Sequence, residues 1–169
     1  VIEKGKISQE PFIEILKTLE EAESANLVDW NAMNIASVDQ MNQPSSRMVL
    51  LKKISDDGLV FYTNYNSRKG KEIELNPKVA VNFWWRELKK QIRVEGFIEK
   101  ASEEDSDDYF NSRPLKSRVS AIISNQSSTI SSYEDLKNQI DNYLEQNDES
   151  SIKRPDHCGL YVVIPNAVE

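Results

Sequence analysis

The sequence predicts a mainly β fold with peripheral helices, an α+β arrangement in which antiparallel strands form a small barrel. Three observations indicate this fold. The β-rich runs come in pairs joined by short polar turns, helical patterns stand towards the ends of the chain, and one short helix crosses between strand pairs. A chain of 169 residues can bury a core without metal or disulfide, so we expect one domain, 1–169.

The amino-terminal half begins with a helix and continues as strands. Apolar residues recur at helical spacing from Ser8 to Ala25, and Pro11 suits the first turn. Ser67 is a suitable N-cap for a short helix that stops before Asn76-Pro77. The strands expected here are 32–38, 46–54 and 59–64, the last two joined by a hairpin connection over 55–58.

The carboxy-terminal half holds one strand pair, several helices and a last strand. Ser102 and the acidic residues after it open a helix that Pro114 ends. The other elements expected are strands 79–85 and 91–100 around a polar connection 86–90, helices 115–124 and 133–146, and a strand 159–164. Trp84 and Trp85 are expected to straddle the barrel wall, one packed inward and one at an interface.

Composition excludes several classes of function. The net charge of -7 and the pI of about 4.9 argue against binding to nucleic acid or an anionic membrane. The amino terminus has no signal-peptide pattern, and the single cysteine, Cys158, fits a cytoplasmic protein. His157 is the only histidine, and nothing has metal-ligand spacing. If the protein is an enzyme, its difficult chemistry belongs to a cofactor.

A basic stretch stands out within this acidic chain. On a strand, Arg47 shares a face with Val49 and Leu51, whereas Lys52 shares one with Met48 and Leu50. A long cation among apolar neighbours either reaches to the surface or meets an anion. The basic residues of the stretch are Arg47, Lys52, Lys53, Arg68, Lys69 and Lys71.

The start of the short helix sharpens that choice. A helix amino terminus offers unpaired N–H groups and a positive dipole end, and Arg68 and Lys69 add cations there. Tyr62 and Thr63 precede it at a strand end. This pattern predicts a phosphate site, without the glycine-rich loops of nucleoside triphosphate or Rossmann binding.

A second anion site is possible where a helix meets Pro114. Tyr109 and Arg113 are four residues apart, so a helical turn would place them on one face, and Ser117 follows. The alternative is an ordinary helix end with Arg113 beside its dipole. The polar turn 125–128 indicates a loop and nothing more by itself.

Taken together, these segments resemble the pyridoxine/pyridoxamine 5′-phosphate oxidases over nearly the whole chain. Seven blocks come in the family's order: R-M-V-L-L-K (47–52), F-Y-T-N (61–64), S-R-K-G (67–70), N-P (76–77), Q-I-R-V-E-G (91–96), Y-F-N-S-R-P (109–114) and N-Q-S-S (125–128). The resemblance implies an FMN-binding split barrel, a homodimer with FMN at the subunit interface.

The resemblance also implies the residues of the site, while no catalytic side chain is identified. The FMN-binding residues would be Arg47, Met48, Val49, Leu50, Leu51, Lys52, Tyr62, Thr63, Arg68, Lys69, Gln91, Gln126 and Ser127. The substrate phosphate would be bound by Lys52, Tyr109, Arg113 and Ser117.

The implied activity is that of a pyridoxal 5′-phosphate synthase. It would oxidise pyridoxamine 5′-phosphate or pyridoxine 5′-phosphate at the 4′ carbon, with O2 as acceptor and H2O2 as product. The family continues past the last strand with a Trp-containing strand and an Arg-x-His-Asp-Arg-like segment, which this sequence lacks, and we expect turnover to require it.

Two alternatives remain open from the sequence. The missing segment leaves room for a non-catalytic flavin or pyridoxal-phosphate binding protein on the same fold. A barrel that binds nucleic acid, with Tyr62 and Tyr65 as stacking platforms, is disfavoured by the acidic total.

Overall fold

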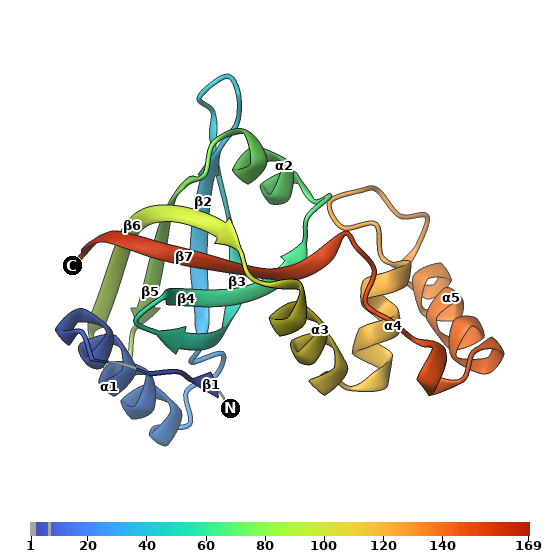
Figure 1. Cartoon of the computed structure of the whole chain (residues 1–169), viewed down its shortest axis with the longest axis horizontal. Helices are drawn as coiled ribbons and strands as arrows, with labels where there is room; N and C mark the ends of the chain where they lie inside the picture. The colour runs from blue at the N-terminus through green and yellow to red at the C-terminus, as the bar shows by residue number, and fades with distance from the viewer. Residues whose placement is uncertain (1–2, 7) are drawn as a thin grey trace. The chain divides into compact units, whose positions relative to one another are not determined.

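The structure, a computed structural model, describes residues 3–6 and 8–169 (Figure 1). Within them the elements are β1 (Glu3–Lys4), α1 (Glu10–Ser24), β2 (Ala32–Val38), β3 (Pro44–Ser55), β4 (Gly58–Asn64), α2 (Arg68–Leu75), β5 (Lys78–Trp85), β6 (Lys90–Lys100), α3 (Glu103–Ser112), α4 (Leu115–Ile123), α5 (Tyr133–Gln146), a short 3-10 helix (Glu149–Ser151) and β7 (Cys158–Val168). The predicted helices and strands are confirmed to within a few residues at most ends. The sequence did not predict β1, and β7 runs four residues beyond the predicted end at residue 164.

The chain divides into two compact units. Unit 1 comprises 1–62, 72–100 and 161–169, and unit 2 comprises 63–71 and 101–160. The division falls within β4, α2 and β7, so these three elements contribute residues to both units. That residues 1–169 form one domain stays a prediction.

Six antiparallel strands close into a barrel, which confirms the predicted fold class. The sheet order is β1-β3-β2-β5-β6-β7-β4, and a further pairing of β3 with β4 closes it. β1 adds to β3 in parallel, outside the closed ring. In Figure 1 the long strands β6 and β7 run side by side, in agreement with their register from Val94↔Val168 to Lys100↔Tyr161.

Side chains along a strand of the barrel wall alternate between a buried inner face and an exposed outer face. On β5, Val81, Phe83 and Trp85 are buried, while Trp84 between them is 59% exposed. The indole of Trp85 stacks on Phe83 with ring centroids 5.2 Å apart, and its N–H donates to the carbonyl oxygen of Trp30 (2.7 Å). The prediction that the two tryptophans straddle the wall is confirmed, and the interface role of Trp84 stays a prediction.

A β-bulge interrupts β3 at Lys52. The strand pairs with β2 as far as Leu50 and with β4 from Leu51 onwards. Leu51 lies opposite Phe61 and Lys53 opposite Val60, which leaves Lys52 as the extra residue. The alternation along β3 is interrupted between the buried Leu51 and the buried Ile54, and the face that Lys52 shares with Met48 and Leu50 stays a prediction.

Unit 2 is mainly helical, and serine side chains cap two of its helices, α3 as expected and α5. The hydroxyl of Ser102 accepts from the amide of Asp105 (3.0 Å), and that of Ser132 accepts from Asp135 (3.0 Å). The half-buried Arg154 donates to Asp107 of α3 and to the carbonyl oxygen of Cys158, each at 2.6 Å. These bonds fix the start of β7 to α3 within unit 2.

The amino terminus of α1 takes its cap from a distant turn. Gln9, the N-cap residue, makes no side-chain cap bond. Instead the carboxylate of Asp56, in the β3–β4 turn, accepts from the amides of Ser8 (2.9 Å) and Gln9 (3.0 Å) and from the Ser8 hydroxyl. The hydrogen bond from that hydroxyl is the main reason why the pKa of Asp56 is lowered.

We predict that Asp56→Ala loosens α1, because its first amides lose their acceptor. Amide hydrogen exchange should become faster over residues 10–14 while the barrel strands keep their protection. Since the folded pKa lies below the ordinary value of 3.8, this contribution is complete above that pH and is lost as the pH falls through the folded pKa. Asp57→Ala is the matched control, since its carboxylate accepts from Ser55; equal exchange in the two variants would contradict the capping role.

Candidate functional site

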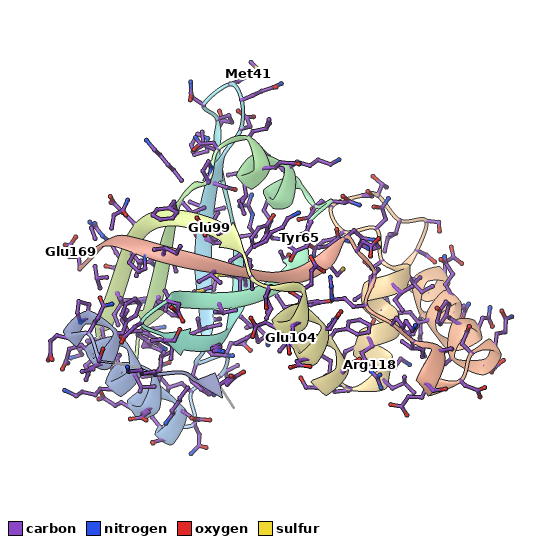
Figure 2. The ribbon with its side chains drawn as sticks, in the orientation of Figure 1. Met41, Tyr65, Glu99, Glu104, Arg118 and Glu169 are labelled. Carbon is purple, nitrogen blue, oxygen red and sulfur yellow. The ribbon has the colours of Figure 1, made fainter. Side chains whose placement is uncertain are left out.

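The predicted phosphate site lies at the amino terminus of α2. Its strand, β4, ends at Asn64, and Tyr65, labelled in Figure 2, opens the turn into the helix. The buried hydroxyl of Ser67 donates to the carbonyl oxygen of Asn64 (2.6 Å) and accepts from the amide of Gly70 (3.3 Å). Ser67 therefore caps α2 as predicted.

Lys69 places a buried cation at this helix end. The residue is 6% exposed, and its ammonium donates to Thr63 Oγ1 (2.8 Å), Gln126 Oε1 (2.8 Å) and Ser67 Oγ (3.3 Å). The hydroxyl of Thr63 also donates to Gln126 Oε1 (3.2 Å). These hydrogen bonds hold the ammonium of Lys69 beside the positive end of the helix dipole.

The loop over residues 125–128 completes the site. Ser127 has a φ of 68°, in the left-handed region that a non-glycine residue rarely adopts. Its hydroxyl accepts from the amide of Arg68 (3.2 Å), the first residue of α2. The sequence marked this segment only as a polar turn, and the structure gives it direct contacts with α2.

These elements line a cavity of about 640 Å³ within unit 2. Its walls are Asn66, Arg68, Lys71, Asn125, Gln126, Ser127 and Ser128. Two walls are basic, and among these described lining residues there is no acidic side chain. A pocket of N–H donors, hydroxyls and cations at a helix amino terminus suits a phosphate dianion.

The second predicted anion site lies at the corner between α3 and α4. α3 ends at Ser112, and its C-cap residue, Arg113, leaves the helix with an extended backbone (φ -77°, ψ 149°), four residues after Tyr109. The two side chains still interact: burial raises the pKa of Tyr109, and the charge of Arg113 opposes that rise. Ser117 lies in the first turn of α4.

In unit 1, Arg47 meets an anion that the sequence did not assign to it. Its guanidinium lies 3.1 Å from the carboxylate of Glu72 and donates to the hydroxyls of Ser37 (2.6 Å) and Ser45. Arg47 is half-buried on the inner face of β3, and Glu72 is 4% exposed. Arg47 thus does not reach to the surface; it belongs to a buried ionic network.

The remaining predicted residues take different surroundings in unit 1. Met48 and Leu50 are 60% and 42% exposed on the outer face of β3, and Leu51 is fully buried on the inner face. The amide of Gln91, on the outer face, donates to Asn82 (2.7 Å). Val49, Lys52 and Tyr62 are half-buried.

The structure therefore brings together part of the predicted site within each unit. Thr63, Arg68, Lys69, Gln126 and Ser127 gather around the cavity of unit 2. Over the residues that the structure describes, no group of His, Cys, Asp and Glu side chains could hold a metal ion, and no helix is long and apolar enough to cross a membrane.

Sequence reasoning missed several residues of these surroundings. Asn66, Asn125 and Ser128 line the cavity through a loop that had no signal of its own. Glu72 was missed because an acid in a short helix resembles a solvated one. The burial of Glu72 could have been inferred from its position in the sequence: it stands three residues after Lys69 and next to Ile73, on the buried side of α2.

Gly70 gives a test of this local packing. A Cβ added there would lie 1.9 Å from the carbonyl oxygen of Tyr65. In an ordinary helix, Gly→Ala stabilises by about 1 kcal/mol. We predict the opposite sign for Gly70→Ala, a loss of about 1–3 kcal/mol in the free energy of unfolding, because the overlap must be relieved by backbone movement.

Urea denaturation of Gly70→Ala and of the control Lys71→Ala, at the exposed next position of α2, measures this difference. A Gly70→Ala protein as stable as the wild type would show that the turn at Tyr65 can move away at little cost.

Comparison with known proteins places these features in a family. Residues 19–146 match the family model described as pyridoxamine 5′-phosphate oxidase. A pyridoxine/pyridoxamine 5′-phosphate oxidase of Nostoc sp. strain PCC 7120 is 46% identical over 164 residues, which are 97% of this chain and 77% of that protein. The enzyme of the same name from Mannheimia succiniciproducens is 41% identical over 168 residues, covering 99% of this chain and 79% of the relative.

Solved structures share the fold. PhzG from Burkholderia lata 383, in complex with tetrahydrophenazine-1-carboxylic acid, aligns with a TM-score of 0.88 at 25% identity, over 96% of this chain and 79% of that one. A pyridoxamine 5′-phosphate oxidase-related, FMN binding protein from Nostoc punctiforme PCC 73102 aligns with a TM-score of 0.76 at 18% identity, over 96% and 84% of the two chains.

Proposed function

The chain belongs to the pyridoxamine 5′-phosphate oxidase family, and we propose that it oxidises pyridoxamine or pyridoxine 5′-phosphate to pyridoxal 5′-phosphate with FMN as its cofactor. The observation that carries the proposal is the cavity at the amino terminus of α2 with the buried cation Lys69 behind it. A family name alone would not distinguish a phosphate-binding member from one that has lost its site.

The donor set fits FMN. Its phosphate needs several N–H and O–H donors and positive charge, and the cavity offers Arg68 and Lys71 beside the helix amino terminus. Gln126 and Ser127 are held in place by Lys69 and the Arg68 amide, so these groups are preorganised. We assign Thr63, Arg68, Lys69, Gln126 and Ser127 to the cofactor phosphate.

The corner between α3 and α4 supplies the substrate's anchor in this proposal. Arg113 offers a planar set of donors to a phosphate, and Tyr109 and Ser117 add hydroxyl donors. The phenol of Tyr109 keeps its proton at neutral pH and can donate it in a hydrogen bond, since burial raises its pKa further above the ordinary value of 10.0. FMN, when bound, would accept a hydride equivalent from the 4′ carbon and pass the electrons to O2, giving H2O2. The protein's residues orient the substrate for that transfer.

We further propose a homodimer and a cytoplasmic location. The outer face of the barrel exposes Met48 and Leu50 on β3 and Trp84 on β5, the two strands that flank β2, and a second copy would cover this apolar surface. The single cysteine, Cys158, is buried, which suits a reducing compartment. The resemblance assigns FMN to this subunit interface, and Lys52, in the bulge of β3, to both ligands.

The dimer predicts that a charge on this surface is not tolerated. Met48→Glu should shift the protein towards monomer in analytical ultracentrifugation, since it would bury an unpaired carboxylate. Met41→Glu, on the exposed turn before β3, is the control and should leave the mass unchanged. A Met48→Glu protein with the mass of the wild type would exclude this face as the interface.

The central test is spectroscopic. Purified protein with FMN should lose its flavin absorbance when pyridoxamine 5′-phosphate is added without oxygen, and admitting air should restore it with release of H2O2. FMN binding without bleaching would favour the alternative, a non-catalytic flavin or pyridoxal-phosphate binding protein. A protein that takes up no FMN would exclude the oxidase, and one that takes up neither FMN nor pyridoxal 5′-phosphate would exclude both.

The two proposed anion sites predict that two substitutions change different quantities, one the FMN affinity and the other the substrate KM. Lys69→Ala should weaken FMN binding by about 10- to 100-fold, the value of one charge-assisted hydrogen bond, measured by quenching of flavin fluorescence. Arg113→Ala should raise the substrate KM by a similar factor and leave the FMN affinity unchanged. Lys116→Ala, whose cation pairs with Asp141 at the surface, is the control for Arg113; the same effect from both substitutions would contradict the separation of the two sites.

A further inference from the structure

Glu72 is a buried carboxylate that the proposed reaction does not use. It is 4% exposed, and its oxygens accept from Ser37 Oγ (2.5 Å), Ser45 Oγ (2.7 Å) and Arg47 Nη2 (3.1 Å). The donors come from two neighbouring strands: Ser37 of β2 is the register partner of Ser45 of β3. All four residues belong to unit 1.

Burying a carboxylate such as Glu72 costs free energy, because the charge loses its hydration. A carboxylate removed from water needs a partner charge and several hydrogen bonds, and a pair of this kind is often no more stable than apolar residues of the same volume. The network therefore contributes more to fixing a direction than to stability. The side chain whose direction it fixes is Arg47.

The geometry around Arg47 leaves its guanidinium little freedom. Nη1 donates to Ser37 Oγ, and Nη2 donates to Ser45 Oγ and to Glu72. Because a guanidinium is planar, bonds at both terminal nitrogens also set the direction of the Nε–H donor. The positive charge is largely compensated by the neighbouring carboxylate.

We propose that Glu72 is the positioning residue for Arg47 in flavin binding. Arg47 then acts as a hydrogen-bond donor of fixed direction within a neutral pair. This inference rests on the proposed function, and it takes as its premise that Arg47 contacts FMN, as the resemblance to the family implies.

Positioning by Glu72 and simple electrostatics predict opposite changes in the FMN affinity when Glu72 is neutralised. A carboxylate near an anionic ligand repels it, so its neutralisation should tighten FMN binding if charge alone matters. If Glu72 positions Arg47, Glu72→Gln should weaken binding, even though the protein becomes one unit more positive. The two views predict opposite directions for one measurement.

The experiment is a fluorescence titration of FMN into the full chain. Glu72→Gln should raise the Kd about tenfold or more, and the control Glu74→Gln, an exposed acid on the same helix, should leave it unchanged. Ser45→Ala, which keeps every charge and removes one shared partner, should raise the Kd in the same direction and guards against a Glu72→Gln protein that folds poorly. Unchanged or tighter binding by the folded variants overturns the inference.

A double-mutant cycle separates positioning from a general loss of structure. In the background of Arg47→Ala, Glu72→Gln should have no further effect on the Kd, because the residue that it positions is gone. Equal effects with and without Arg47 would overturn the inference. If the wild type binds no FMN, the proposed function fails and this inference with it; if the wild type binds and Glu72→Gln binds equally well, this inference fails alone.

Discussion

The closure of the barrel through one strand is the constraint on which the rest of unit 1 depends. β3 pairs with β2 along its first part and with β4 along its second, and the bulge at Lys52 stands at the change of partner. A strand that serves two neighbours in turn has to bend, and a bulge supplies that bend together with extra twist. Closure also gives β3 one face towards the core and one towards solvent. Leu51 packs inside, while Met48 is left on the outer surface, where the proposed second copy would cover it.

The short helix α2 shows how a segment with little stability of its own is held in place. Eight residues are too few for a stable isolated helix, since about 12–15 are marginal in water. Within unit 2, its amino terminus is fixed by the Ser67 cap, by the close approach of Gly70 to Tyr65 and by the bonds of Lys69. Within unit 1, Glu72 is fixed by its bonds to β2 and β3. Charged groups thus serve as anchors in a helix that lacks a large apolar face, and of these groups the ammonium of Lys69 is the one suited to an anionic ligand.

The sequence predicted the elements well because period and turn chemistry are local. The helix 133–146 was predicted with the bounds that the structure shows, and its start carries local signals, Ser132 as N-cap and the acids after it, that need no tertiary information. The bulge at Lys52 could not be predicted: two consecutive lysines in a strand look alike, and only the register against β4 distinguishes them. The partner of Arg47 was missed for a similar reason. Glu72 is distant in sequence, and its burial depends on how α2 meets the barrel wall.

The two proposed anion sites would have unequal roles in deciding what the protein acts on. A site for the cofactor phosphate is needed by every member that uses FMN, so the groups around Lys69 and Gln126 cannot by themselves select a substrate. Selection has to come from residues that contact the second ligand, and the α3–α4 corner is suited to this because Pro114 breaks the helix there. The break gives Arg113 an extended backbone, and its side chain is no longer tied to the spacing of a helix. A change in the length or angle of this corner would move a guanidinium relative to the flavin while leaving the cofactor phosphate site intact. Substrate choice can therefore vary within this fold without any change in the chemistry, which belongs to the cofactor.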